Sequence, residues 1–251
     1  MWTLTLVALH CKVYLMSPLR ALVVCFAAPL VICAPAAADA RQTYEAKLTK
    51  QREGVASGFK QAIDYLPSEG GGKPHAVERI VFALPRRARI DTTAIPPCAA
   101  TDAEFQIKGA DACPLETRLG SGLLTADTGL TLELVPRIIE FGVTFFNAED
   151  ELILFAESTN TLGPPLRVAS RIEVRRRKLI STVPPIPGAP PPDPFLALDE
   201  VSNHLRRARS PGGAYILTPP RCLPRGFWRV RAEFTYRDGT VETERSKTRC
   251  R

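Results

Sequence analysis

The sequence predicts an all-β fold: an antiparallel β-sandwich with one short helix between Cys98 and Cys113, stapled by two disulfides. Apolar and polar residues alternate along most of the chain after residue 40, as in strands that bury one face, and amphipathic helical patterns are few. The four cysteines after residue 40 are an even number, which is typical of a disulfide framework in an exported chain. All-β domains of this length commonly form one unit, so we expect a single domain over 41–251.

The first 40 residues differ in composition from the rest and predict an export signal. From Met16 a short positive segment ends at Arg20, an apolar run extends from Ala21 to Cys33, and a small-residue stretch ends at Ala40. This order matches the parts of a signal peptide, and the apolar run is shorter than the roughly 20 residues of a membrane-spanning helix. Residues 1–15 add a second apolar stretch that such a signal does not need. We therefore expect translation to start at Met16, cleavage after Ala40, a secreted or cell-envelope location, and no transmembrane span in the mature chain.

Strands are expected where alternation is clear and turn residues bound it. The predicted strands are Val77–Leu84, two within 117–135 that turn near Asp127-Thr128-Gly129, a hairpin of Ile138–Phe146 and Leu152–Glu157, Val168–Val174, Leu196–Leu205, Ala214–Thr218 and a final hairpin.

A short helix is predicted between the first two cysteines of the mature chain. Thr101 and Glu104 stand in capping-box relation before a polar helical stretch that stops near Gly109. Four cysteines allow three connectivities, and their spacing favours the local pairs Cys98–Cys113 and Cys222–Cys250.

The final hairpin is predicted from Asp238-Gly239, a strong signal for a two-residue loop between alternating runs. In that register Lys247 and Arg245 lie opposite Val230 and Ala232, which suits a charged sheet edge.

The segment 184–194 holds seven prolines in eleven residues, which favours an extended polyproline II conformation. Two interpretations are open: a linker between two domains, or a crossover loop over one sandwich. The crossover is favoured, because the 57 residues after the segment are few for an independent core.

No catalytic, cofactor-binding or metal-binding constellation stands out. The glycine-rich stretch Ser68–Lys73 is followed by Pro74, where a phosphate-binding loop needs Ser or Thr, so a flexible loop is favoured. His75 and His204 are not spaced with cysteines as zinc ligands are, and Glu149–Glu151 are adjacent turn residues that do not face each other across a cleft.

Three basic runs are the most suggestive feature of a chain whose formal net charge is +7. If they converged in space, they would attract anionic envelope polymers or acidic lipids; the alternative is that each is a solvated strand end. Interleaved aromatic residues for base stacking are absent, so no specific nucleic acid is expected. The runs are Arg86, Arg87 and Arg89; Arg175, Arg176, Arg177 and Lys178; and Arg206, Arg207 and Arg209.

Several segments between about Val77 and Cys250 share one order of features: Leu84-Pro85-Arg86, 90–104, 109–114, 118–122, Pro184–Pro187, 215–222 and 236–240 with the terminal cysteine. In these segments the chain resembles a group of exported actinobacterial proteins of unknown function. The resemblance supports the local cysteine pairs and one domain, and it supplies no activity and no functional residues. One departure is Arg87, which stands where the group usually has Gly after Leu-Pro-Arg.

Together these observations predict an exported, noncatalytic binding or structural module of the cell envelope that needs no cofactor. One alternative is a secreted hydrolase, which requires two facing carboxyl groups in a cleft with a shifted pKa. The other is a polyanion-binding protein that uses the arginine runs.

Overall fold

The computed structural model describes residues 40–130, 136–187 and 194–251. The predicted signal peptide lies outside these ranges apart from Ala40, as does the second strand expected within 117–135. No helix in the described ranges is long and apolar enough to span a membrane.

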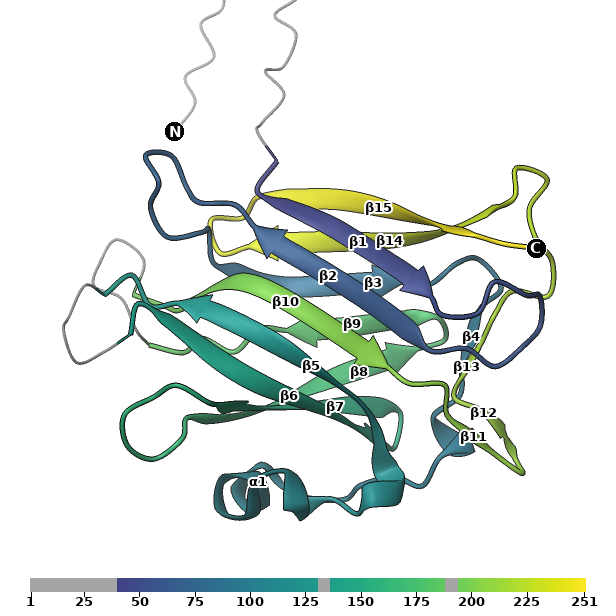
Figure 1. The fold of residues 1–251 in the computed structure, drawn as a ribbon, viewed down its shortest axis with the longest axis horizontal. Coiled ribbons are helices and arrows are strands. Elements are labelled where there is room, and N and C mark those ends of the chain that lie inside the picture. The colour runs from purple at the N-terminus through teal and green to yellow at the C-terminus, as the bar shows by residue number, and fades with distance from the viewer. Residues whose placement is uncertain (1–39, 131–135, 188–193) are drawn as a thin grey trace, which may run out of the picture. The chain divides into compact units, whose positions relative to one another are not determined.

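Eleven strands of the described ranges form one antiparallel sheet, in the order β1-β2-β10-β5-β6-β7-β8-β9-β3-β14-β15 (Figure 1). Four short strands, β4 (Arg89–Ile90), β11 (Arg209–Ser210), β12 (Gly213–Ala214) and β13 (Ile216–Leu217), form two small ribbons beside it. The strands of the large sheet are β1 (Gln42–Leu48), β2 (Phe59–Tyr65), β3 (Val77–Ala83), β5 (Arg118–Asp127), β6 (Ile138–Ala148), β7 (Glu151–Ser158), β8 (Arg167–Arg175), β9 (Lys178–Thr182), β10 (Ala197–Leu205), β14 (Phe227–Tyr236) and β15 (Val241–Arg249).

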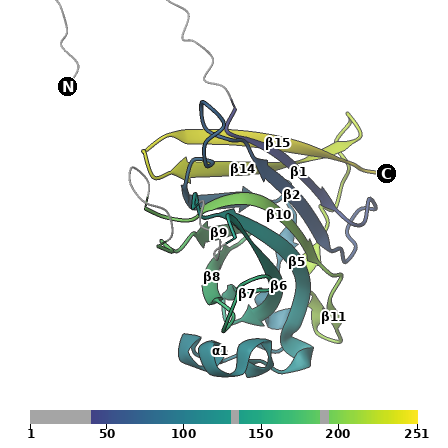
Figure 2. The same cartoon turned by 60° about the vertical axis from the view of Figure 1, so that its left-hand side comes forward.

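The sheet curls until its two edge strands meet, so that it is nearly a barrel (Figure 2). Side chains rather than a backbone ladder join the edges: the amide of Ala46 donates to Oγ of Ser246 at 3.0 Å, and the amide of Arg41 donates to Oε2 of Glu242 at 3.3 Å. The all-β class with one short helix and two disulfides is thereby confirmed, with the opposing layers supplied by one curved sheet.

The core lies on the inner face of this curve. In β1 the buried residues alternate strictly with exposed ones, and the Tyr44 ring packs against Phe82 and Phe234 with centroids 6.1 Å away in each case. Offset and edge-on aromatic pairs of this kind add to the free energy gained by burial. The sequence interpretation did not include β1, β2 or β9, although the alternation in β1 is as clear as in any predicted strand.

The proline-rich segment connects β9 to β10, two strands of the same sheet that lie five positions apart in its order. The described residues at its two ends lie next to each other, since the amide of Leu196 donates to the carbonyl of Ile186 at 2.9 Å. Residues 188–193 of the predicted crossover lie outside the described ranges.

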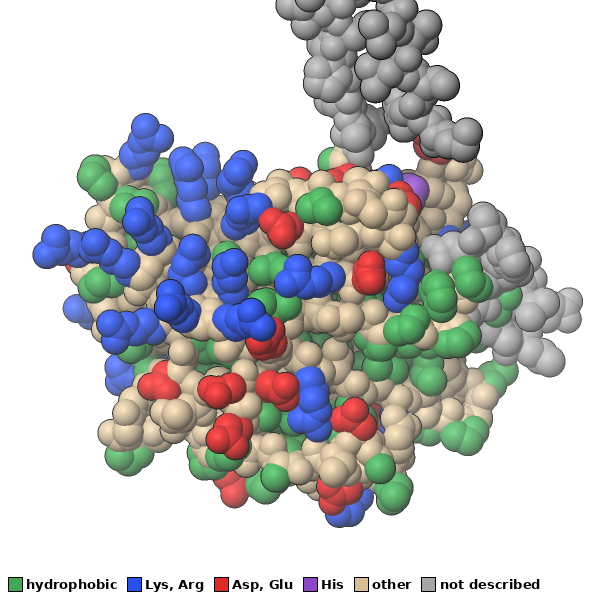
Figure 3. All heavy atoms as spheres, turned by 180° about the vertical axis from the view of Figure 1, so that it is seen from behind, with side chains coloured by type: hydrophobic (Ala, Val, Ile, Leu, Met, Phe, Trp, Pro, Cys, Tyr) green, Lys and Arg blue, Asp and Glu red, His purple; other side chains and the backbone are tan. Residues whose placement is uncertain are grey.

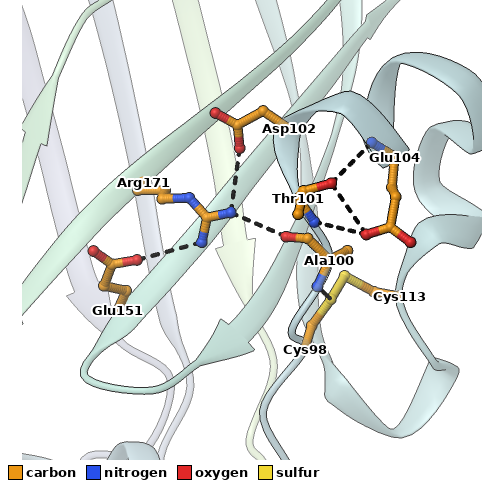
Figure 4. A network of polar contacts seen from close by, with 8 residues as sticks. All are labelled: Cys98, Ala100, Thr101, Asp102, Glu104, Cys113, Glu151 and Arg171. Carbon is orange, nitrogen blue, oxygen red and sulfur yellow. Dashed lines mark hydrogen bonds and ion pairs between the residues drawn. A yellow bond between two sulfur atoms is a disulfide. The ribbon is translucent and has the colours of Figure 1, made fainter.

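The helix α1 (Asp102–Lys108) covers the outer face of β6, β7 and β8, and its capping box is present as predicted. Phe105 is fully buried against Phe146 and Phe155, so a second small core forms on the outside of the sheet. Arg171 of β8 fixes the start of the helix, because its guanidinium lies between Glu151, Asp102 and the carbonyl of Ala100 (Figure 4).

Both predicted disulfides are confirmed. Cys98 and Cys113 have Cα atoms 5.4 Å apart and bracket α1, which returns the chain to its starting point. Cys222 and Cys250 have Cα atoms 5.7 Å apart and close the base of the final hairpin. A bridge of either kind is worth roughly 3 kcal/mol through its constraint on the unfolded chain.

The final hairpin is present, but the predicted register is wrong by one residue. Tyr236 and Thr240 close a three-residue loop, in which Gly239 adopts a left-handed φ of 84°. A turn followed by a left-handed residue is the usual three-residue hairpin loop, whereas the prediction assumed a two-residue loop. The shift places Lys247 opposite Arg229 and Arg245 opposite Arg231, in place of Val230 and Ala232.

Asn147 fastens the segment before the first disulfide to the sheet, and its removal is expected to destabilise the fold. Its fully buried Nδ2 lies 2.8 Å from the Thr92 carbonyl, 2.6 Å from that of Ile95 and 3.3 Å from that of Pro96. We expect Asn147→Ala to lower the free energy of unfolding by about 3 kcal/mol, because buried acceptors lose their donor. Urea denaturation measures this, and the exposed turn substitution Glu149→Ala should change stability by less than about 0.5 kcal/mol.

Candidate functional site

Two of the three basic runs lie side by side. The first follows β3, and the second forms the turn between β8 and β9. Their backbones are hydrogen-bonded to each other: the amide of Leu84 donates to the carbonyl of Arg177 at 3.0 Å, and the amide of Ile90 donates to that of Arg176 at 3.3 Å. The Arg177 guanidinium also donates to the Leu84 carbonyl at 2.5 Å. The fold itself therefore brings these two runs together.

These two runs form one side of an open cleft of about 570 Å³, which we call the basic cleft. The other lining residues are Gly54, Leu217, Thr218 and Pro220, and Leu217 is the strand partner of Arg89. Every charged side chain that lines the cleft is cationic. The four are Arg87, Arg89, Arg176 and Arg177.

Two of the four arginines adopt strained backbone conformations. Arg87 has a φ of 70° and Arg176 a φ of 56°, in the left-handed region that residues other than glycine rarely occupy. The turn at Arg87 is nevertheless closed, since the amide of Ala88 donates to the Pro85 carbonyl at 3.0 Å. Strain of this kind clusters at functional sites, so its presence in both turns of the basic cleft marks the cleft as a candidate site.

A second set of cations extends the cleft along the outer face of the final hairpin. Arg229 lies opposite Lys247, and Arg231 lies opposite Arg245; these four residues are the basic ladder. Like charges directly opposite each other destabilise a sheet by a few tenths of a kcal/mol or more. Arg231 is paired with Glu233 at 2.6 Å, whereas no carboxylate among the described residues forms an ion pair with the other three.

The basic ladder and the basic cleft are contiguous. Arg231 pairs with Ala83 of β3, and Ala83 pairs with Lys178 of β9, so one row across the sheet runs from Arg245 to Lys178. Seen from behind, most Lys and Arg side chains gather over the upper left of the molecular face, with a few acidic ones among them, and most of the acidic side chains lie below (Figure 3). The sequence interpretation missed the ladder because its hairpin register set apolar residues opposite Arg245 and Lys247.

The third run is separate from the cleft. It follows β10, and the Arg206 guanidinium donates to the carbonyl of Arg118 at 3.0 and 2.6 Å. Tyr215 lies between this run and the first run. The Tyr215 amide donates to the Ala208 carbonyl, and the Tyr215 carbonyl accepts from the Asp91 amide. Arg207 and Arg209 are exposed and are not among the residues that line the basic cleft. Two runs converge, and the third does not join them.

The remaining candidates from the sequence occupy turns and strands without forming a reactive group. Ser68–Lys73 is a tight turn, and Glu149 and Asp150 lie in the turn between β6 and β7.

Two carboxyl groups have lowered pKa values. Hydrogen bonds at the capping box, from the Thr101 backbone first, lower the pKa of Glu104. Burial opposes ionisation of Asp238, but hydrogen bonds from Thr240 and Arg41 outweigh it and lower its pKa to about 2. No cluster of metal-ligating side chains occurs in the described ranges.

His204 lies next to Lys60 on the outer face of the sheet. Desolvation first, and the Lys60 ammonium second, lower the pKa of His204. The folded protein therefore binds this proton more weakly than the unfolded chain, so stability falls as the pH drops from about 6.5 through the lower folded-state value. We expect Lys60→Gln to raise the pKa of His204 only partly, because desolvation persists, and to reduce this acid-induced loss. An NMR titration of the imidazole measures the shift; an unchanged pKa would contradict the assigned cause.

Arg87→Gly tests whether the strain in the cleft costs stability. Glycine adopts the left-handed conformation freely, and the gain is partly offset by the greater freedom of the unfolded chain. We expect the free energy of unfolding to stay equal or to rise by up to about 1 kcal/mol. Chemical denaturation checks this against Arg86→Gly, which removes the same charge at a position without positive φ and should destabilise.

No protein-family model, curated protein sequence or solved structure matches the chain.

Proposed function

We propose that this chain is an exported, noncatalytic binding module of the cell envelope whose basic cleft and basic ladder hold a linear polyanion. The observation that carries the proposal is the convergence of two arginine turns, fixed to each other by backbone hydrogen bonds, in a cleft with only cationic charge on its walls. A packed fold has no structural need to set four guanidinium groups together, and mutual repulsion opposes the arrangement.

The spacing of the cations favours a polymer over a single small anion. The row from Arg245 through Arg231 and Lys178 to Arg175 crosses β15, β14, β3, β9 and β8. With strands about 4.8 Å apart, four steps span about 19 Å. A chain of repeating phosphate or sulfate groups can contact several of these cations at once, which a single phosphate cannot.

The chemistry of the side chains favours phosphate or sulfate as the repeating group. Guanidinium groups donate two parallel hydrogen bonds to such oxygens and remain charged at any physiological pH. Arg87, Arg89 and Arg176 are exposed at the cleft and free to turn toward a ligand, whereas Arg177 is half-buried and holds the Leu84 carbonyl. The first three would therefore bind, and the fourth would position the turn.

Two structural disulfides support the location outside the cytoplasm, because such bonds persist in oxidising compartments. The resemblance to exported actinobacterial proteins supports the same assignment. The hydrolase alternative needs two facing carboxyl groups in a cleft with a shifted pKa. The pKa of Glu104 and that of Asp238 lie below their usual values, but Glu104 belongs to the capping box of α1 and Asp238 to the loop of the final hairpin, so they do not form such a pair. No observation therefore favours it over binding.

The test is binding of the oxidised protein to polyphosphate over a salt series, with neutral dextran as the uncharged control. We expect saturable binding to polyphosphate that weakens steeply with salt, since counterion release drives such association. Arg245→Gln should weaken binding about threefold, as expected for one exposed ion pair, and lower the salt slope by about one. Lys108→Gln removes one charge from α1 and should leave affinity unchanged. Salt-resistant binding, or equal losses in both variants, would contradict the assigned surface.

A further inference from the structure

The inner face of the curled sheet lines a partly open cavity of about 120 Å³, and none of the arginines of the basic cleft is among its lining residues. Strands β2, β3, β5, β6, β7, β8, β9 and β10 line it, together with the first residues of the proline-rich crossover. Its wall is apolar, with rings such as Phe59, Phe141 and Phe145, and none of the lining side chains carries a charge. A cavity of comparable size with such a lining accepts a benzene-sized molecule.

Five polar side chains interrupt this apolar wall: the hydroxyl residues Ser170, Ser181 and Thr182, and the two amides of Gln61 and Asn203. Gln61 of β2 and Asn203 of β10 lie directly opposite each other in the strand register, and both line the cavity. Asn203 is only 8% exposed. Among the described residues, Oε1 of Gln61 and Oδ1 of Asn203 are buried and accept no hydrogen bond. Because an unpaired buried acceptor is costly, a native fold that retains two adjacent ones calls for a partner outside the chain.

Gly122 makes room for the amide of Asn203. It is the β5 residue paired with Asn203, and a Cβ atom there would lie 2.0 Å from Oδ1 of Asn203 and 2.6 Å from the Ser202 carbonyl. Any other residue at this position would displace the amide. The absence of a side chain at Gly122 is therefore part of the site, because it lets Asn203 extend along the wall of the cavity.

We propose that the cavity is a binding site for an uncharged, apolar molecule, or the apolar end of a larger one, that carries a hydroxyl or amide N–H group. The apolar wall takes the body of the ligand, and the oxygens of Gln61 and Asn203 accept its hydrogen bonds. A charged group is excluded, because no lining side chain can neutralise it. The site is independent of the polyanion surface, since the cations of that surface lie outside the sheet.

Phenol and toluene are the matched probes, because they share a ring and differ in the hydroxyl donor. Calorimetric titration of the oxidised protein should show both probes binding. In Asn203→Leu, which replaces the amide by an apolar group of similar size, the ratio of phenol affinity to toluene affinity should fall about tenfold, as expected for the loss of one hydrogen bond. Ser202→Ala, at the adjacent outward-facing position, should leave the ratio unchanged.

A second pair of measurements locates the site and guards against a variant that does not fold. Ala156→Leu fills the cavity from β7 and should abolish binding of both probes, and Gln61→Met repeats the test of the hydrogen bond from the other strand. A ratio that is the same in wild type, Asn203→Leu and Gln61→Met would overturn the role of the amides. Failure of both probes to bind the wild-type protein would overturn the site, and the two oxygens would then be partnered by an ordered water. Neither result alters the binding expected of polyphosphate.

Discussion

The inner face of the sheet has no second sheet to pack against, and this constraint shapes the whole molecule. The sheet buries that face by curling until β1 and β15 meet, and the rings of Tyr44, Phe82 and Phe234 pack together inside the curve. The contact between β1 and β15, which we call the seam, differs from the other strand contacts, because hydrogen bonds to the side chains of Ser246 and Glu242 take the place of a backbone ladder. The internal cavity and the outward display of cations both follow from this closure, which commits one side of nearly every strand to the interior.

Local patterns in the sequence predicted much of the fold. The β6–β7 hairpin, α1 with its capping box, and both disulfides depend on residues close together in the chain, and these features were predicted. The strand order was not, because β10 lies between β2 and β5, and such neighbours are set by packing across long separations. The register of the final hairpin was wrong because Asp238-Gly239 fits two loop lengths, and only the position of Gly239 as the third loop residue distinguishes them.

Only part of the candidate surface could be predicted from the sequence. The runs at Arg86 and Arg175 stand out by composition, but their contact depends on hydrogen bonds between two loops about ninety residues apart. The ladder was hidden by the one-residue register error, which exchanges the neighbours of Arg245. The amide pair in the cavity gave no signal, because Gln61 and Asn203 belong to strands whose pairing no local pattern reveals.

The seam also determines when during synthesis the sheet can close. Its two strands are separated by nearly two hundred residues, so β1 has no partner for its outer edge until β15 has been synthesised. At 5–20 residues per second this interval is roughly ten to forty seconds. During this interval the apolar inner face cannot be closed off from solvent. Contacts between residues so far apart in sequence also form slowly once synthesis is complete. A chain with this topology therefore exposes apolar surface during synthesis for much longer than one whose strands pair with their neighbours in sequence, and in that time it is open to aggregation or to binding by a chaperone.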